Sequence, residues 1–274
     1  MSTEKVTIQQ RRANRDIYYQ EQHVTTEKYV APYINQYHHI TPQSRILEIG
    51  CGEGGNLKYF IDQGCEVVGI DIAEGKIANA EKLCSKFCDD TSNLTLICED
   101  IYDTDGEKLG RFDVIMMRDV IEHIPDQERF LSYLKTFVKK DGIIFFGFPP
   151  WQMPFGGHQQ GCQSVLSKVP YFHLLPNPLY KGVLKMFGEP DRRINSLMQT
   201  KSTGISIERF KKYSIDAGWK IIDESPYLIN PNYEAKFHLS PRKQNSIINN
   251  LPYIRKFLTT GAYYIIGREY HNHK

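Results

Sequence analysis

Long apolar stretches, paired cysteine motifs and an apolar leader are all missing from this sequence. No run of about 18 apolar residues occurs, so no membrane-spanning helix is expected. Residues 1–15 are polar and charged, which argues against a secretory signal. The six cysteines are scattered without a paired C-x-x-C pattern, and Cys84 and Cys88 fit a buried helix face better than a metal pair. These absences predict a protein of the reducing cytoplasm that binds no metal.

Internal repeats and low-complexity tracts are also absent, which leaves an ordinary globular composition. The 274 residues are 41% hydrophobic and 24% charged, so the chain can bury a sizeable core. Short apolar runs alternate with helical patterns, which is typical of an α/β fold with a mostly parallel sheet. We expect strands at 45–49, 66–70, 94–98, 112–117, 142–148, 219–224 and 263–268, and helices at 56–63, 74–87, 127–139 and 206–217.

The alternation stops after residue 148, where a long stretch with many prolines shows no clear periodicity. Such a stretch often forms a lid or a binding wall. Its apolar run 165–187 fits a wall or lid better than a lipid contact, because prolines and lysines interrupt it. We expect a single domain with a helical cap at 1–40, a core at 41–148, a substrate lid at 149–203, and a C-terminal part of the sheet at 204–274 that holds a second insertion at 225–260.

Charge is unevenly distributed, although the net charge is only +2. Residues 151–203 hold six Lys or Arg against two Asp or Glu, and residues 225–274 hold seven against two. One interpretation is that these are solvated surfaces. The other is that both segments line a substrate site and favour an anionic group.

A glycine-rich loop stands between the first expected strand and the helix that follows it. Gly50, Gly52 and Gly55 fit the spacing G-x-G-x-x-G, which lets the chain turn sharply and lets a ligand approach the backbone. Asp71 follows about 20 residues later, where a carboxylate can accept hydrogen bonds from both hydroxyls of a ribose. These residues alone fit a dinucleotide site and an S-adenosylmethionine (SAM) site equally well.

Three further features favour SAM. Glu48 precedes the first glycine by two residues, and an acidic group there suits a cationic amino-acid ligand better than a pyrophosphate. Asp100 and Ile101 follow the third strand, where a carboxylate can accept from an adenine amino group beside an apolar contact. A polar loop at 118–125 follows the fourth strand, at the sheet edge where open α/β folds bind ligands.

Four segments in this order resemble the class I SAM-dependent methyltransferases, in particular the UbiG-like small-molecule type: 46–54, 69–72, 99–101 and 119–123. The resemblance covers residues 40–150, with weaker support from 210–224 and the last strand. It implies a Rossmann-like sheet of seven strands, mostly parallel, with helices on both faces and the last strand antiparallel.

The resemblance also implies roles for individual residues. Glu48 would organise the glycine loop, and the backbone of Gly50, Cys51 and Gly52 would face the methionine portion of SAM. The other implied cofactor contacts are Asp71 with the ribose, Ile72 with the adenine face, Asp100 and Ile101 with the adenine rim, and Arg118 near the methionine end.

The expected activity is methyl transfer to a small or medium-sized acceptor, anionic or partly apolar, with oxygen favoured over nitrogen or carbon. An NAD-dependent oxidoreductase and a catalytically inactive binding protein of the same fold are the alternatives. Nucleic acid is not expected as a partner, because no N/D-P-P-Y motif follows the fourth strand. The sequence leaves the acceptor and the oligomeric state open.

His158 is the candidate catalytic residue. It lies in a glycine-flanked loop after the fifth strand, and an imidazole can accept a proton near neutral pH. The alternative is a histidine that only hydrogen-bonds its own loop. Glu122 and His123 are expected to begin and pack a helix rather than act as an acid and a base.

Overall fold

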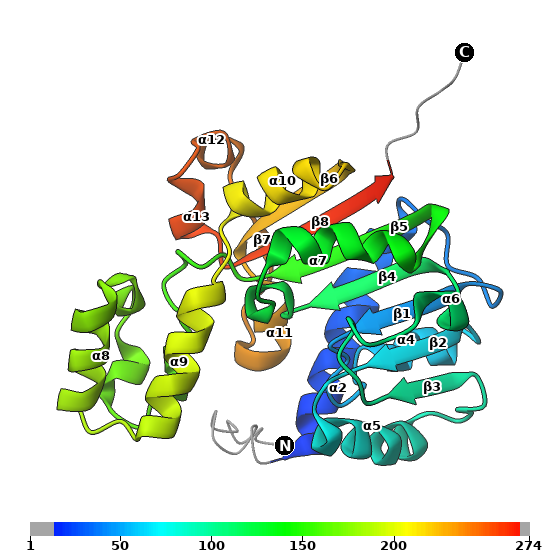
Figure 1. Ribbon diagram of the computed structural model, residues 1–274, viewed down its shortest axis with the longest axis horizontal. Helices are drawn as coiled ribbons and strands as arrows, with labels where there is room; N and C mark the ends of the chain where they lie inside the picture. Colours follow the sequence, from blue (N-terminus) through cyan, green and yellow to red (C-terminus); the bar gives the residue numbers. More distant parts are fainter. Residues whose placement is uncertain (1–13, 269–274) are drawn as a thin grey trace. The chain divides into compact units, whose positions relative to one another are not determined.

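The computed structural model describes residues 14–268, and within them one sheet runs in the order β3-β2-β1-β4-β5-β8-β6-β7 (Figure 1). The chain divides into two compact units, and each unit is made of three segments that alternate along the sequence with those of the other. The first comprises Met1–Met117, Thr136–Phe145 and Pro231–Ser240. The second comprises Arg118–Lys135, Phe146–Asn230 and Pro241–Lys274.

Parallel strands form the centre of the first unit. β1 pairs in parallel with β2 and β4, and β2 pairs with β3. Aliphatic side chains fill β1, β2 and β4 and are almost all buried, as parallel strands covered on both faces require. The strands are β1 (Arg45–Ile49), β2 (Glu66–Ile70), β3 (Leu94–Ile97) and β4 (Phe112–Arg118).

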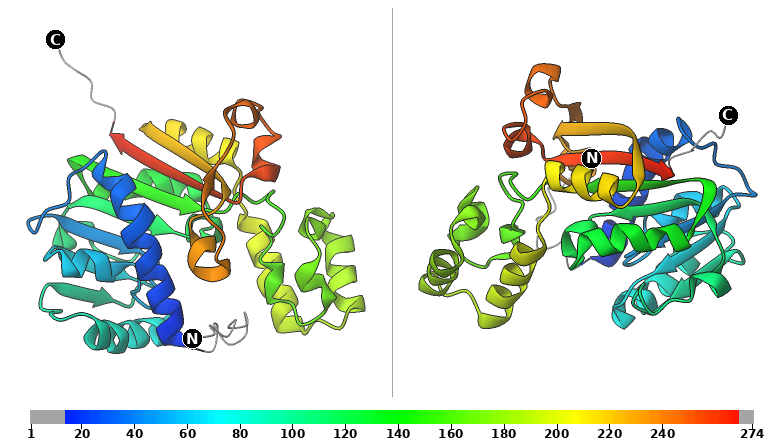
Figure 2. Two further views of the ribbon diagram at one scale, coloured as in Figure 1. Left: turned by 180° about the vertical axis from the view of Figure 1, so that it is seen from behind. Right: turned by 45° about the horizontal axis from the view of Figure 1, so that its top comes forward.

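Helices of the first unit present apolar faces to these strands. In α5 the buried side chains recur every three or four residues, the period of one helix face. The N-terminal helical stretch, dark blue in Figure 2, runs past the strands, and α11 packs against its first helix. The elements are α2 (Arg15–Thr25), the π turn η1 (Thr26–Val30), α3 (Ala31–Asn35), α4 (Leu57–Asp62), α5 (Glu74–Phe87), α6 (Gly106–Leu109) and α11 (Asn232–Phe237).

In the second unit β6 (Trp219–Ile229) pairs antiparallel with β8 (Gly261–Arg268), and the two-residue β7 (Arg242–Lys243) adds to β6. Aromatic rings fill the space between β8, the end of β5 and α10. The ring centroids of Phe210 and Tyr264 lie 4.7 Å apart, and those of Phe148 and Phe210 lie 5.0 Å apart. The other elements are η2 (Ile121–His123), α7 (Gln127–Tyr133), η3 (Leu134–Thr136), α10 (Ile207–Asp216), α12 (Ser246–Asn249) and α13 (Arg255–Leu258).

The expected lid at 149–203 contains two helices that lie side by side, α8 (Asn177–Met186) and α9 (Asp191–Thr203) (Figure 1). Three short turns precede them: η4 (Gln159–Gly161), η5 (Val165–Lys168) and η6 (Phe172–Leu174). This segment has an apolar core of its own, formed by Cys162, Leu166, Phe172, Tyr180, Leu184, Ile194 and Leu197. It is therefore a packed helical subdomain, although its sequence shows little periodicity.

Several of the expected element boundaries are wrong. The helix expected at 127–139 ends at Tyr133, and β5 (Val138–Phe148) begins where its last turn was expected. Lys139 and Lys140 before Gly142 are typical of a helix end, and the expected bounds followed from them. In the structure Lys139 instead donates to the Asp113 carboxylate at 2.8 Å, a contact between residues far apart in sequence. β6 continues to Ile229, which shortens the second insertion, and β7 raises the strand count of the described residues from seven to eight.

The expected cap at 1–40 is helical from Arg15 to Asn35, and its first 13 residues lie outside the described part. Among the described residues, no helix combines the length and the apolar character needed to cross a membrane.

Candidate functional site

The glycine loop follows β1 directly. Gly50 and Gly52 have positive φ angles of 70° and 58°, which glycine adopts without a steric penalty. The Gly50 and Cys51 N–H groups both donate to the Ile70 carbonyl, at 2.7 and 3.0 Å, which holds the loop against the end of β2. A Cβ built on Gly52 would meet no atom within 4 Å, so this turn borders open space.

Asp71 joins the glycine loop to the start of α5. Its Oδ2 accepts from the Gly52 N–H at 2.9 Å, and its Oδ1 accepts from the Ala73 N–H at 2.9 Å. The side chain is buried, and Lys76 Nζ lies 3.6 Å from Oδ2. The carboxylate therefore orders two backbone segments at the edge where the ribose was expected.

Glu48 is fully buried inside β1. Its Oε1 accepts from Asn56 Nδ2 at 2.6 Å, and Asn56 Oδ1 accepts from the Thr26 hydroxyl at 3.0 Å. The hydrogen-bonded chain Thr26–Asn56–Glu48 links η1, the start of α4 and the end of β1, directly before the glycine loop. Sequence reasoning missed Asn56 and Thr26; the only local signal was a polar residue directly after the loop.

The residues expected around adenine differ in exposure. Ile72 is 71% exposed, an unusual position for a large aliphatic side chain, while Ile101 is buried. Asp100 Oδ1 accepts from the Tyr102 N–H at 3.0 Å and is half-buried. Arg118 is buried at the end of β4.

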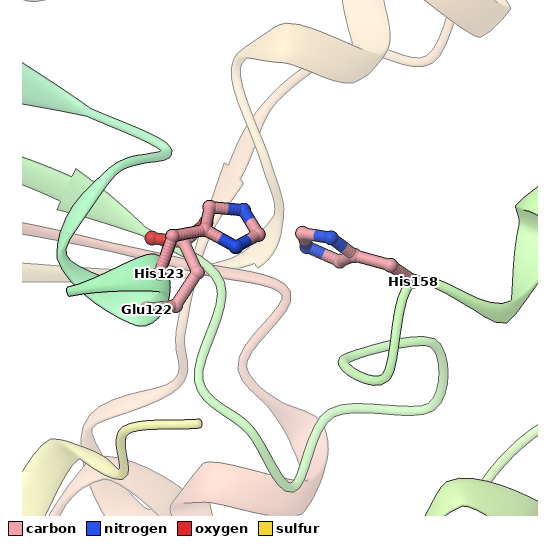
Figure 3. A group of neighbouring side chains, drawn as sticks. All are labelled: Glu122, His123 and His158. Atoms are coloured by element: carbon pink, nitrogen blue, oxygen red, sulfur yellow. The ribbon is translucent and has the colours of Figure 1, made fainter. Parts of the chain in front are cut away.

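A second group of polar side chains lies within the second unit. Glu122 and His123 belong to η2, three residues after β4, and His158 lies in the loop after β5 (Figure 3). The two imidazole rings face each other with centroids 5.0 Å apart and planes inclined by 60°. One potential ligand atom from each of the three residues lies within 4.8 Å of the others.

Glu122 is the most unusual member of this group. The side chain is buried, and neither carboxyl oxygen has a hydrogen-bond partner among the described residues. Burial raises the pKa of Glu122 well above its usual value, and the nearby Asp119 charge adds to the shift. The three groups can accept or pass a proton, and the same three could also hold a divalent cation.

The loop that carries His158 is fixed by buried polar contacts. Burial lowers the pKa of His173 to about 4, so the ring is neutral at pH 7. We infer that its Nε2 donates to the Trp151 carbonyl, 2.7 Å away, because a carbonyl can only accept. Its Nδ1 then accepts from Gln159 Nε2 at 3.4 Å. His158 itself has a positive φ of 56°, which this network must maintain.

The comparison with protein families decides the class of the central segment. Residues 47–144 match the family model described as a methyltransferase domain. This match assigns residues 47–144 to a methyltransferase domain. The matched segment contains Glu48, the glycine loop, Asp71, Asp100 and the Glu122–His123 pair. It ends before His158 and the α8–α9 subdomain.

Curated relatives of this methyltransferase domain include two ubiquinone biosynthesis O-methyltransferases. The one from Rhodopseudomonas palustris is 34% identical over 100 residues, which are 36% of this chain and 38% of the relative. The one from Chromobacterium violaceum is 32% identical over 104 residues, 37% of this chain and 43% of the relative. The matches thus span less than half the length of these relatives.

Solved structures match more of the chain at lower identity. Magnesium protoporphyrin IX methyltransferase from Synechocystis, with bound SAH, has a TM-score of 0.54 at 15% identity and covers 98% of this chain and 90% of its own. A SAM-dependent methyltransferase from Clostridium acetobutylicum has a TM-score of 0.54 at 12% identity, over 94% of each chain. At these identities the likeness shows the methyltransferase fold.

Proposed function

We propose that the protein transfers the methyl group of SAM to a small or medium-sized acceptor, on oxygen in preference to nitrogen or carbon. The observation that carries this proposal is that two buried carboxylates order the glycine loop and its neighbouring segments. Buried Glu48 and Asp71 each hold a segment at the carboxyl ends of β1 and β2, inside the part of the chain that matches the methyltransferase family. Ubiquinone biosynthesis O-methyltransferases among the relatives support oxygen as the acceptor atom.

The described residues fit SAM in their chemistry. Gly52 leaves open space beside the loop, and Ile72 offers an exposed apolar surface next to the Asp71 carboxylate. Asp71 would hold the ribose, Ile72 and Ile101 the adenine, and the Gly50–Gly52 backbone the methionine portion. SAM supplies a methyl group already activated on a positively charged sulfur. The protein must then place the acceptor atom and exclude water.

An oxygen acceptor must lose its proton, and His158 is our candidate to accept it. The His123 ring faces it at 5.0 Å and can share the positive charge, so we add His123 to the proposed site. Glu122 lies beside them, and burial and the Asp119 charge raise the pKa of its carboxyl. The prediction that the site holds no metal remains part of this proposal.

Two cations of the basic segments have partners within the protein. Arg255 lies 3.4 Å from Glu208 and 3.6 Å from Glu224, and Lys201 donates to the His173 carbonyl at 2.6 Å. Because these cations already have partners, part of the excess positive charge in the two basic segments is structural. Our proposal therefore leaves the acceptor either anionic or neutral.

Titration calorimetry with SAM, SAH and NAD tests the cofactor. We expect SAM and SAH to bind and NAD not to bind, and the opposite order would favour the oxidoreductase alternative. Incubating the protein with methyl-labelled SAM and a metabolite extract tests the reaction. Label in a small molecule supports the proposal, whereas label confined to protein or RNA contradicts the acceptor class. Binding of SAM without turnover of any acceptor would favour the inactive binding protein.

A further inference from the structure

Two cysteines and a tyrosine meet beside the glycine loop, within the first unit. The Tyr19 hydroxyl lies 3.6 Å from Cys84 Sγ and 3.6 Å from Cys88 Sγ. Tyr19 and Cys84 are fully buried, and Cys88 is 9% exposed. The Tyr19 ring also stacks on Phe87, with centroids 5.2 Å apart, so the cluster joins α2 to the end of α5.

The two thiols have unequal acidity. A hydrogen bond from Cys84 is the main reason that the pKa of Cys88 is lowered to about 7, and the Tyr19 hydroxyl and the Lys58 charge contribute. Burial and the Asp62 charge oppose this shift. The same pairing raises the pKa of Cys84. A thiolate is the reactive form of cysteine, so Cys88 is the thiol prepared for attack and Cys84 is its protonated neighbour.

The backbone permits the two sulfurs to bond. Residues four apart in a helix have Cα atoms about 6 Å apart, which is within the range of natural disulfides. Cys88 is the C-cap residue directly after Phe87, the last residue of α5, and it already has an extended backbone, with φ −105° and ψ 143°. The chain can therefore rotate at Cys88 without breaking the rest of α5.

We propose that Cys84 and Cys88 are a redox-sensitive pair that peroxides convert to a disulfide. The Cys88 thiolate sulfur attacks one peroxide oxygen, so an S–O bond forms, the O–O bond breaks and hydroxide leaves. The Cys84 sulfur then attacks the Cys88 sulfur. The S–S bond forms, the S–O bond breaks, and the departing hydroxide takes the Cys84 proton as water.

This reaction would reach the glycine loop by direct contact. A Cβ built on Gly54, where φ is 81°, would lie 2.9 Å from Cys84 Sγ, and one on Gly55 would lie 2.5 Å from the Tyr19 carbonyl oxygen. A disulfide draws Cys84 Sγ toward Cys88 and removes the thiol partners of the buried Tyr19 hydroxyl, which disfavours the packing of α2 on the loop. This step rests on the proposed function, and it predicts that oxidation weakens SAM binding by roughly tenfold.

Peptide mass spectrometry after brief exposure of the full chain to hydrogen peroxide tests the pair. We expect a Cys84–Cys88 disulfide before any modification of Cys98, which is the exposed thiol of the six. In Cys84→Ser, Cys88 should stop at the sulfenic acid and react with dimedone. Tyr19→Phe keeps the ring but loses the hydroxyl, so Cys88 should alkylate more slowly than in the wild type. Oxidation of Cys98 first, or no Cys84–Cys88 linkage, overturns the proposal.

Calorimetry on reduced and oxidised protein separates this inference from the proposed function. If the reduced protein binds SAM and the disulfide form binds equally well, the link to the glycine loop is refuted. If the reduced protein binds no SAM, the proposed function fails, while the peptide map still decides whether the redox pair exists. We also expect that dithiothreitol, which reduces the disulfide, restores the SAM affinity of the oxidised protein.

Discussion

The imidazole rings of His123 and His158 lie with their centroids 5.0 Å apart, although one follows β4 and the other follows β5 (Figure 3). If His158 accepts the proton of the acceptor, His158→Ala should reduce the rate of methyl transfer by about 10²–10⁴ and leave SAM affinity nearly unchanged. The wild-type rate should fall at low pH as the imidazole becomes protonated. Steady-state kinetics and calorimetry measure the two effects.

His39→Ala is the matched control for this variant, because His39 is exposed on the first unit. It should leave the rate unchanged. Full activity in His158→Ala would reduce His158 to a loop residue. Loss of SAM binding in that variant would instead place the loop in the cofactor site.

A chelator separates proton transfer from metal chemistry in the Glu122, His123 and His158 group. We expect the rate to be unchanged after dialysis against EDTA, because the sequence shows no metal-binding pattern. Metal content by plasma mass spectrometry is the second measurement. Loss of activity that magnesium or zinc restores would show that these three side chains hold a cation.

Replacing Asp71 should weaken SAM binding by about 1–3 kcal/mol, the scale of hydrogen bonds to a charged group. Asp71→Asn is the better variant, because it keeps a side-chain oxygen for the Gly52 or Ala73 N–H while it removes the charge. Asp103→Ala, at an exposed site after β3, serves as the control. An unchanged dissociation constant in Asp71→Asn would mean that the ribose is bound elsewhere.

Removing the amide that donates to Glu48 should destabilise the fold. Asn56→Leu deletes the 2.6 Å bond to a buried carboxylate, so the free energy of unfolding should fall by about 1–3 kcal/mol. Urea unfolding at pH 7 checks this. Thr26→Val removes only the outer bond of the chain and should cost less. If both variants lowered the free energy of unfolding by the same amount, the hydrogen bond from Asn56 to Glu48 would contribute no more than the bond from Thr26 to Asn56.

Acid should loosen the loop that carries His158. The pKa of buried His173 is about 4 in the folded state and near 6.5 when unfolded, so the unfolded chain binds the proton more readily. The stability that neutral His173 contributes is complete above pH 6.5 and is lost as the pH falls toward 4, by roughly 3 kcal/mol. Urea unfolding at several pH values measures this slope. His173→Gln should flatten it, and an unchanged slope would contradict the assignment.

Local sequence signals predicted the elements that depend on local interactions. The expected bounds of β1, β2 and α5 agree with the structure, because β1 and β2 are buried along almost their whole length and the buried side chains of α5 recur every three or four residues. The helix expected at 127–139 was too long because Lys139 and Lys140 suggested a helix end. In the structure Lys139 pairs with Asp113, a contact far apart in sequence that no local pattern contains.

The residues of the candidate site were likewise predictable only where their signals are local in the sequence. Glu48 lies near the end of β1, and Asp71 and Asp100 follow β2 and β3, so their order and spacing along the chain were sufficient to propose them as cofactor contacts. The meeting of His123 with His158 was not foreseen, because it depends on the path of an irregular loop. That path is set by Gln159 and His173, whose buried hydrogen bonds leave no periodic trace in the sequence.

The α8–α9 subdomain packs around its own apolar core, and this core does not include the sheet. Side chains on its outer surface, such as Leu179 and Met186, can therefore change without disturbing the central fold. During divergence, this segment can be exchanged or lengthened while the strands that follow the family pattern stay the same. A chimaera that carries the corresponding segment of another methyltransferase would be the natural starting point for altering acceptor preference.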